Sequence, residues 1–229
     1  MKREITGAIL LPFVVALIYW GPPIWFYFLS LVAILLGTWE YFNLASKMGV
    51  EGYPLLGFIM SFLLSLCFYF EGRYFQEWII IFLFAQFVTW YLKDRNPRIA
   101  IDQMAYTLIG VLWVAGTLGH FILIRNLENG RFLLFFVFFV VWSGDTFAYY
   151  GGRKFGKYSF FPLISPKKTL EGSFCGVVAS ISAGALAHFW FLKEILVTHC
   201  LIMGLFCGII GQFGDLAESV LKRNARVEA

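Results

Sequence analysis

Charged residues are scarce in this chain. Only 14% of its 229 residues are Asp, Glu, Lys or Arg, whereas 60% are hydrophobic and 20% are aromatic. A soluble domain carries about 25% charged residues, so the composition excludes an ordinary water-soluble enzyme and a disordered chain. The net charge of +4 does not indicate a nucleic-acid partner, because the basic residues lie in loops between apolar runs, where membrane topology accounts for them.

Patterns typical of metal and redox sites are also missing. The four cysteines all fall inside apolar runs, and no two of them are spaced as CxxC. The three histidines are scattered among apolar neighbours without an HExxH motif. We interpret both residue types as packing residues rather than as zinc ligands or redox centres.

Long uncharged runs dominate what remains. A helix needs about 20 apolar residues to cross a bilayer. The first run, residues 5–39, is long enough for two helices and is interrupted by Gly21-Pro22-Pro23, where proline ends a helix. Further runs cover residues 52–70, 75–92, 103–124, 131–153, 172–192 and 195–214. The sequence therefore predicts an all-α, polytopic integral membrane protein with about eight transmembrane helices.

The distribution of basic residues predicts the orientation of these helices. If the N-terminus is cytoplasmic, only Arg73, Arg125, Arg131 and Lys193 lie outside. All other basic residues then lie inside: Lys2, Arg3, Lys47, Lys93, Arg95, Arg98, Arg153, Lys154, Lys157, Lys167, Lys168, Lys222, Arg223 and Arg226. The positive-inside rule thus predicts a multi-pass protein of the cell (inner) membrane with both termini cytoplasmic. We expect one transmembrane domain over residues 1–229, with less specific spans in 5–124 and the chemistry in 132–229.

Two acidic residues interrupt the apolar pattern near the cytoplasmic side. Asp145 lies within the span 131–153, about 10 Å from its cytoplasmic end at 1.5 Å per residue. A carboxylate at that depth is costly unless it lines a wet cavity or pairs with a cation, although a structural contact with a neighbouring helix is an alternative. Asp215 ends the last span on the same side.

Residues after Asp215 carry a second polar pattern. In a helix, Asp215, Glu218, Ser219 and Lys222 share one face. Mg²⁺ is typically held by one or two carboxylates together with substrate phosphates, so this face could hold a metal and a nucleotide. The alternative is a helix end that leaves the membrane, with Lys222 and Arg223 reaching lipid headgroups.

A basic loop connects the two acids. It begins at Arg153 and Lys154 and ends in Ser165-Pro166-Lys167-Lys168-Thr169-Leu170-Glu171-Gly172. Its lysines and glycines suit phosphate binding, yet it is no Walker A motif. Locally, Ser165 also fits an N-cap and Pro166 a first helical turn. Both acids and this loop are predicted to converge at the cytoplasmic leaflet.

At these residues the sequence resembles the phosphatidate cytidylyltransferase family. The resemblance is carried by Asp145 to Tyr149, by Gly152 and Gly156, by Ser165 to Gly172, and by Gly214 to Ser219 with Lys222 and Arg223. It implies an enzyme that transfers a cytidylyl group from CTP to phosphatidate, giving CDP-diacylglycerol and pyrophosphate for phospholipid biosynthesis. The resemblance thus implies CTP and a membrane lipid as substrates, and it leaves a homodimer open.

The resemblance also implies roles for individual residues. Asp215 would bind Mg²⁺, with Glu218 as a second candidate ligand and a second cation left open. Asp145 would orient a basic partner or bind that second cation, and Lys168 would be a catalytic residue together with Asp215 and Asp145. Substrate phosphates and hydroxyl contacts would be provided by Ser165, Lys167, Lys168, Thr169, Lys222 and Arg223. We expect the chain to lack the C-terminal end of the family signature, which holds another metal-coordinating aspartate, so activity of this shortened chain stays open.

Two other classes of function stay open. Multi-span chains with intramembrane acids are often transporters, although the polar residues here concentrate at one leaflet and not at the midplane. A noncatalytic membrane subunit is the other alternative. A CDP-alcohol phosphotransferase is disfavoured, because its helical motif of several aspartates is absent.

Overall fold

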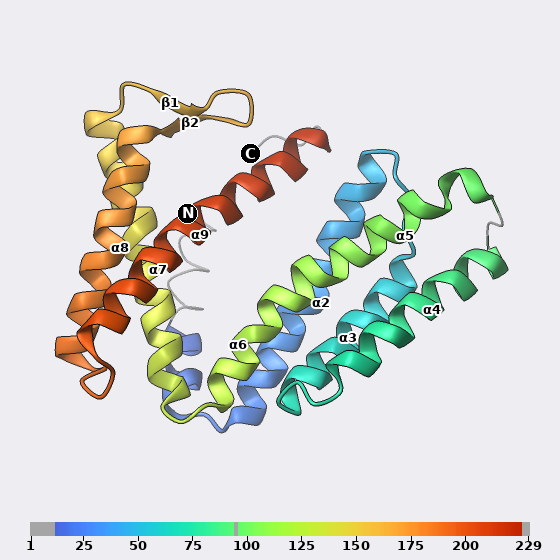
Figure 1. Cartoon of the computed structure of the whole chain (residues 1–229), viewed down its shortest axis with the longest axis horizontal. Coiled ribbons are helices and arrows are strands. Elements are labelled where there is room, and N and C mark those ends of the chain that lie inside the picture. Colours follow the sequence, from blue (N-terminus) through green and yellow to red (C-terminus); the bar gives the residue numbers. More distant parts are fainter. Residues whose placement is uncertain (1–11, 94–95, 226–229) are drawn as a thin grey trace. The chain divides into compact units, whose positions relative to one another are not determined.

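Helices make up most of the described part of the protein. The structure, a computed structural model, describes residues 12–93 and 96–225, so the predictions for Lys2, Arg3, Arg95 and Arg226 lie outside the described residues. The chain divides into two compact units, Met1–Arg131 and Phe132–Ala229. Each unit is described by itself, and both are drawn in Figure 1.

Among the described residues, six helices are long and apolar enough to cross a membrane: Pro23–Lys47, Phe75–Lys93, Pro97–Asn126, Gly130–Phe155, Leu170–Trp190 and Val197–Asn224. The predicted span over 52–70 forms a shorter apolar helix, Pro54–Tyr69. The first predicted span is helical over residues 12–20, and its beginning lies outside the described residues. The polytopic all-α prediction is confirmed, whereas the side of the membrane on which each terminus lies stays a prediction.

Proline and its neighbours set the helix boundaries of the Met1–Arg131 unit. Its helices are α2 (Pro23–Lys47), α3 (Pro54–Tyr69), α4 (Phe75–Lys93), α5 (Pro97–Val111), the π-helical turn η1 (Leu112–Gly116) and α6 (Thr117–Asn126). The predicted break at Gly21-Pro22-Pro23 is confirmed, because Pro22 is extended and Pro23 opens α2. Asn96 caps α5 by accepting a hydrogen bond from the Arg98 backbone N–H at 3.1 Å.

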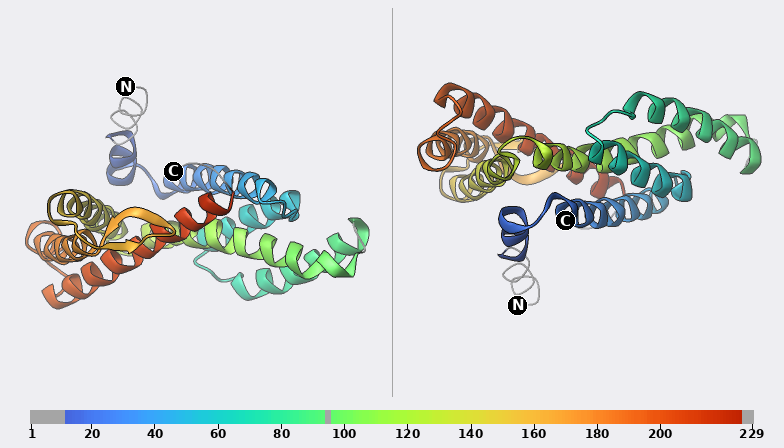
Figure 2. Two further views of the ribbon diagram at one scale, coloured as in Figure 1. Left: turned by 90° about the horizontal axis from the view of Figure 1, so that it is seen from above. Right: turned by 90° about the horizontal axis from the view of Figure 1, so that it is seen from below.

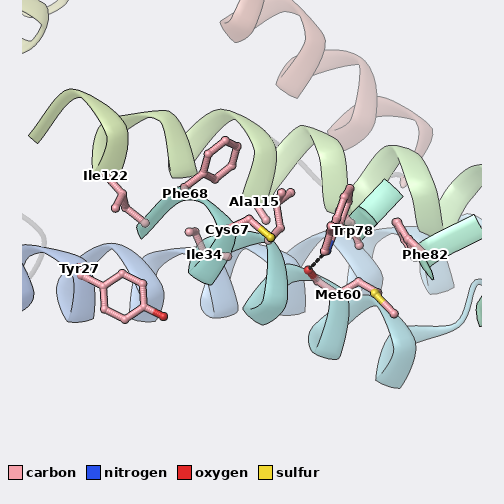
Figure 3. Packing of buried hydrophobic residues seen from close by; sticks show 11 residues of the cluster. Tyr27, Ile34, Met60, Cys67, Phe68, Trp78, Phe82, Ala115 and Ile122 are labelled. Atoms are coloured by element: carbon pink, nitrogen blue, oxygen red, sulfur yellow. Dashed lines mark hydrogen bonds between the residues drawn. The ribbon is translucent and has the colours of Figure 1, made fainter. Parts of the chain in front are cut away.

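Buried hydrogen bonds link the helices of this unit. Figure 3 shows its core, where the Trp78 indole N–H of α4 donates to the Met60 carbonyl of α3 at 3.1 Å. Nearby, the Thr38 hydroxyl of α2 donates to the Ser61 hydroxyl of α3 at 3.1 Å. Because the membrane interior contains no water to bond polar groups, these interhelical hydrogen bonds lower the cost of burying polar side chains there.

The Phe132–Ala229 unit consists of three long helices and a hairpin. These are most of α7 (Gly130–Phe155), β1 (Ser159–Phe161), β2 (Ser165–Thr169), α8 (Leu170–Trp190) and α9 (Val197–Asn224). The two strands are antiparallel, with Ser159 opposite Thr169. In Figures 1 and 2 the hairpin extends from α7 and α8 across α9, and the Arg223 Nε–H donates to the Ile164 carbonyl at 3.4 Å.

Small residues bring the backbones of α8 and α9 together. A Cβ on Gly184 would lie 2.5 Å from the Cys200 carbonyl oxygen, and one on Gly204 would lie 2.7 Å from the Ser180 carbonyl oxygen. Such approach is typical of membrane helices with a small residue at every fourth position. This close contact at Gly184 and Gly204, here called the seam, fixes the register of the two helices that supply part of the site described below.

Two predictions for the segment between α7 and α8 are wrong. Ser165 and Pro166 do not begin a helix, because they lie in strand β2 and Thr169 is the N-cap of α8, accepting from the Gly172 backbone N–H at 3.2 Å. Proline is tolerated there because a strand edge needs no N–H donor from it. Arg153 belongs to the last turn of α7 and not to a loop.

Candidate functional site

A polar cavity of about 550 Å³ lies within the Phe132–Ala229 unit, a volume typical of small-molecule sites. Helices α7, α8 and α9 and strand β2 all contribute to it. Its lining residues, here called the polar cavity, are Asp145, Ala148, Tyr149, Gly152, Arg153, Ser165, Lys167, Lys168, Thr169, Gly172, Ser173, Gln212 and Asp215. The predicted convergence of the two acids and the basic segment is therefore confirmed, whereas its place at the cytoplasmic leaflet stays a prediction.

An ion pair joins the hairpin to α9 at this cavity. The Lys168 Nζ lies 3.1 Å from Asp215 Oδ2, with side chains 29% and 54% exposed. Because both groups keep much of their contact with solvent, the pair contributes little to stability. It places an ammonium group and a carboxylate side by side in the cavity wall, where either group can bind a ligand.

Asp145 reaches the same cavity from α7. It lies ten residues before Phe155, the last residue of the helix, which corresponds to about 15 Å along the axis. The carboxylate is thus deeper from the helix end than the predicted 10 Å, because α7 continues beyond Arg153. Likewise α9 does not end at Asp215 but continues to Asn224.

Backbone contacts fix the ends of the hairpin that carries the lysines. The Glu171 Oε2 accepts hydrogen bonds from the backbone N–H groups of Lys157 and Tyr158 at 3.0 and 3.3 Å. The Leu170 N–H donates to the Tyr158 carbonyl at 2.9 Å. These contacts tie the chain entering β1 to the first turn of α8, so Lys167 and Lys168 are presented from a supported strand.

The segment after Asp215 is helical, as predicted, but its polar side chains have separate partners and do not form one group. Glu218 pairs with Lys222 one turn further on, and the Ser219 hydroxyl donates to the Asp215 carbonyl at 2.8 Å. Glu218, Lys222 and Arg223 are not among the lining residues of the polar cavity. Their metal and phosphate roles stay predictions that the geometry does not bring together with Asp145.

Two polar residues of the cavity are absent from the sequence prediction. The Gln212 side-chain N–H on α9 donates to the Ser173 carbonyl on α8 at 3.0 Å. The signal for Gln212 is its place in an otherwise apolar run, three residues before Asp215, because a polar side chain inside a span is costly without a partner.

The composition of the cavity suits an anionic ligand with a hard cation. Three basic residues, Arg153, Lys167 and Lys168, line it together with two acidic ones, Asp145 and Asp215. Among the described residues, no group of three or more His, Cys, Asp or Glu side chains forms a closed metal site. Two carboxylates in one cavity nevertheless fit Mg²⁺, which takes one or two carboxylates and completes its shell with water and phosphate oxygens.

Comparison with known proteins gives similarity along the whole chain. The sequence model of the Cytidylyltransferase family matches residues 1–228. A phosphatidate cytidylyltransferase of Bacillus subtilis (strain 168) is 31% identical over 151 residues, which are 66% of this chain and 56% of that protein. A protein of the same name from Haemophilus influenzae is 28% identical over 255 residues, covering 99% of this chain and 87% of that protein.

A third relative shows the same limited coverage as the first. It is a phosphatidate cytidylyltransferase of Staphylococcus epidermidis, 33% identical over 138 residues, which are 60% of this chain and 52% of that protein. The chain thus spans about half the length of several curated relatives that it matches. Since the family match covers nearly every residue, this chain belongs to the Cytidylyltransferase family.

Proposed function

We propose that this protein transfers a cytidylyl group from CTP to phosphatidate, giving CDP-diacylglycerol and pyrophosphate. The observation that carries the proposal is a cavity between apolar helices that combines Asp145 and Asp215 with Lys167 and Lys168. A nucleotide and a lipid phosphate are both polyanions, and lipid is supplied by the surroundings of the helices. The names of the relatives support the same reaction.

The reaction needs no protein nucleophile. A phosphate oxygen of phosphatidate attacks the α-phosphorus of CTP, a new P–O bond forms, and the bond to pyrophosphate breaks. Catalysis then consists of holding the two reactants in line and neutralising charge at the reacting phosphates. Lys167 and Lys168 donate charge-assisted hydrogen bonds to phosphate oxygens, while the Ser165 and Thr169 hydroxyls donate neutral ones.

Asp145 and Asp215 are the residues that would hold Mg²⁺, with Glu218 as a further candidate. The metal, when bound, would supply positive charge that offsets the negative charge developing on the pyrophosphate leaving group. Lys168 keeps the Asp215 carboxylate oriented toward the cavity through their 3.1 Å contact. Lys222 and Arg223 stay candidates for phosphate contacts at the outer edge of the site.

Location follows from the same features. The helices make this a multi-pass membrane protein, and the bias of basic residues favours the cell (inner) membrane with the polar cavity facing the cytoplasm. A homodimer stays a prediction. Its measurement is the mass of the detergent-solubilised protein by light scattering.

The test is turnover by the purified 229-residue chain in lipid, with labelled CTP, phosphatidate and Mg²⁺. CDP-diacylglycerol should form, and Asp215→Asn should reduce its rate at least about 100-fold by removing charge at the metal and at Lys168. Asp102→Asn, an exposed acid of α5, is the matched control and should keep the wild-type rate. Transport of an ion without nucleotide turnover would overturn the proposed reaction, whereas equal rates in both variants would remove Asp215 from the metal role.

A further inference from the structure

A second, apolar cavity of about 250 Å³ adjoins the polar one in the same unit. Phe160 of β1 contributes to its wall, together with Phe174 and Val177 of α8 and Ile209 and Phe213 of α9. The proposed reaction uses none of these side chains. The wall is almost wholly hydrocarbon, so the cavity suits an aliphatic chain and not a nucleotide.

The two cavities meet at one pair of residues. Ser173 and Gln212 line both of them, and the Gln212 side-chain N–H bonded to the Ser173 carbonyl spans from α9 to α8 at that boundary. A ligand that fills both cavities must therefore be polar at one end and apolar at the other, with its polar end at Lys168 and Asp215.

The apolar cavity extends along α8 and α9 from Leu170 and Leu216, beside the polar cavity, to Val177 and Ile209. Ile209 precedes Asp215 by six residues, about 9 Å along α9, and Val177 follows Ser173 by four residues, about 6 Å along α8. In these two helices both steps lead from the polar cavity toward the middle of the span. This is the direction that an acyl chain takes when its headgroup lies at the membrane surface.

A larger apolar cavity on the other side of α8 lacks this connection. It has about 600 Å³ and is lined by residues such as Phe139, Phe147 and Val178. It shares Phe174 with the smaller apolar cavity but shares no residue with the polar cavity. Continuity with the phosphate-binding residues therefore singles out the smaller cavity.

We propose that the cavity between Phe160, Val177, Ile209 and Phe213 binds one acyl chain of the phosphatidate whose phosphate lies in the polar cavity. The proposal rests on the proposed function for the identity of the lipid. It makes these side chains determinants of acyl-chain preference, because a chain that cannot enter the cavity loses contact there while its phosphate stays bound.

Neighbouring isoleucines on α9 provide a matched test. Ile209→Trp fills the cavity, whereas Ile210→Trp adds the same ring at a position that is 64% exposed and lines none of the three cavities described. The ratio of kcat/KM for dioleoyl over dihexanoyl phosphatidate should fall about tenfold in Ile209→Trp and stay at the wild-type value in Ile210→Trp. A fall of equal size in both variants would overturn the proposal.

Binding without turnover separates this proposal from the reaction itself. Phosphatidate carrying a photoreactive diazirine on one acyl chain should label peptides of α8 and α9 in the wild-type chain without CTP. Ile209→Trp should reduce that labelling several-fold, and unlabelled phosphatidate should compete for it. Labelling confined to the cavity in a chain that does not turn over CTP would refute the reaction and keep the acyl site, whereas labelling that Ile209→Trp leaves unchanged would refute the site.

An opposite change guards against a folding defect in the filled variant. Phe213→Ala enlarges the cavity at a side chain that is 58% exposed, so it should leave the thermal unfolding temperature near the wild-type value. In this variant kcat/KM for phosphatidate with branched or bulkier acyl chains should rise relative to kcat/KM for dioleoyl phosphatidate. An unchanged ratio of these two values in the folded variant would contradict the acyl site.

Discussion

The ion pair between Lys168 and Asp215 allows stability and catalysis to be separated in one variant. Lys168→Gln keeps an unbranched polar side chain with a hydrogen-bond donor, one methylene shorter, but removes the charge. The side chains are 29% and 54% exposed and lie 3.1 Å apart, so losing the pair should cost only about 0.2–1 kcal/mol of unfolding free energy.

The expected loss of activity is larger. A charged donor aimed at a reacting phosphate typically supports about 100-fold to 1,000-fold in rate, or about 2.7–4 kcal/mol of transition-state stabilisation. Lys168→Gln should therefore lower kcat/KM at least about 100-fold while the thermal unfolding temperature in detergent shifts by only a few degrees. Both quantities are measured on the same preparation with CTP, phosphatidate and Mg²⁺.

Lys193→Gln is the matched control, because Lys193 is an exposed lysine beyond the opposite end of α8. It makes the same chemical change away from the polar cavity and should leave both quantities near wild type. The reasoning is refuted if Lys168→Gln retains kcat/KM within about threefold of the control. It is also refuted if Lys168→Gln loses more than about 2 kcal/mol of unfolding free energy, because the ion pair would then be structural.

Two further predictions concern residues that support the site. Gly204→Ala should destabilise the protein by about 1–3 kcal/mol, because its Cβ would lie 2.7 Å from the Ser180 carbonyl oxygen. Thermal unfolding compares this variant with Gly214→Ala, whose Cβ has nothing within 4 Å, and equal shifts in unfolding temperature would contradict the prediction. Glu171→Gln should weaken the hydrogen bonds from the Lys157 and Tyr158 backbone N–H groups, so limited proteolysis should cleave this segment several-fold faster than in wild type, and an unchanged cleavage rate would show that the carboxylate charge is dispensable there.

Much of the fold could be predicted because its signals are local. The Gly21-Pro22-Pro23 break follows from proline chemistry at one point of the chain, and the spans follow from runs of apolar residues. The convergence of Asp145 and Asp215 needed only one further step, since alternate crossings return the ends of α7 and the C-terminal half of α9 to the same side. These features require no knowledge of which residues pack together.

The hairpin could not be predicted because its pairing is not local. Ser165 and Pro166 fit a helix start as well as a strand edge, and only the pairing of Ser159 with Thr169 decides between them. Glu218 does not line the polar cavity, for a related reason. Helical periodicity places it near the same face as Asp215, but the rise of 1.5 Å per residue also moves it along the helix axis. There Lys222, one turn further on, is its ion-pair partner.

The pattern of residue sizes in α8 and α9 explains why the cavities lie where they do. Gly184 and Gly204 bring the two backbones into close approach toward the helix ends that lie away from the polar cavity, which leaves no room for a ligand there. Toward the polar end the hydrogen bond from Gln212 to Ser173 links the two helices, and bulky residues such as Phe174 line the apolar cavity beside it. Polar and apolar cavities thus open on either side of one hydrogen bond, held at that place by glycines two to three turns away. Changes at the seam should accordingly affect phosphate binding and acyl-chain preference together, whereas changes at Ile209 should affect acyl-chain preference alone.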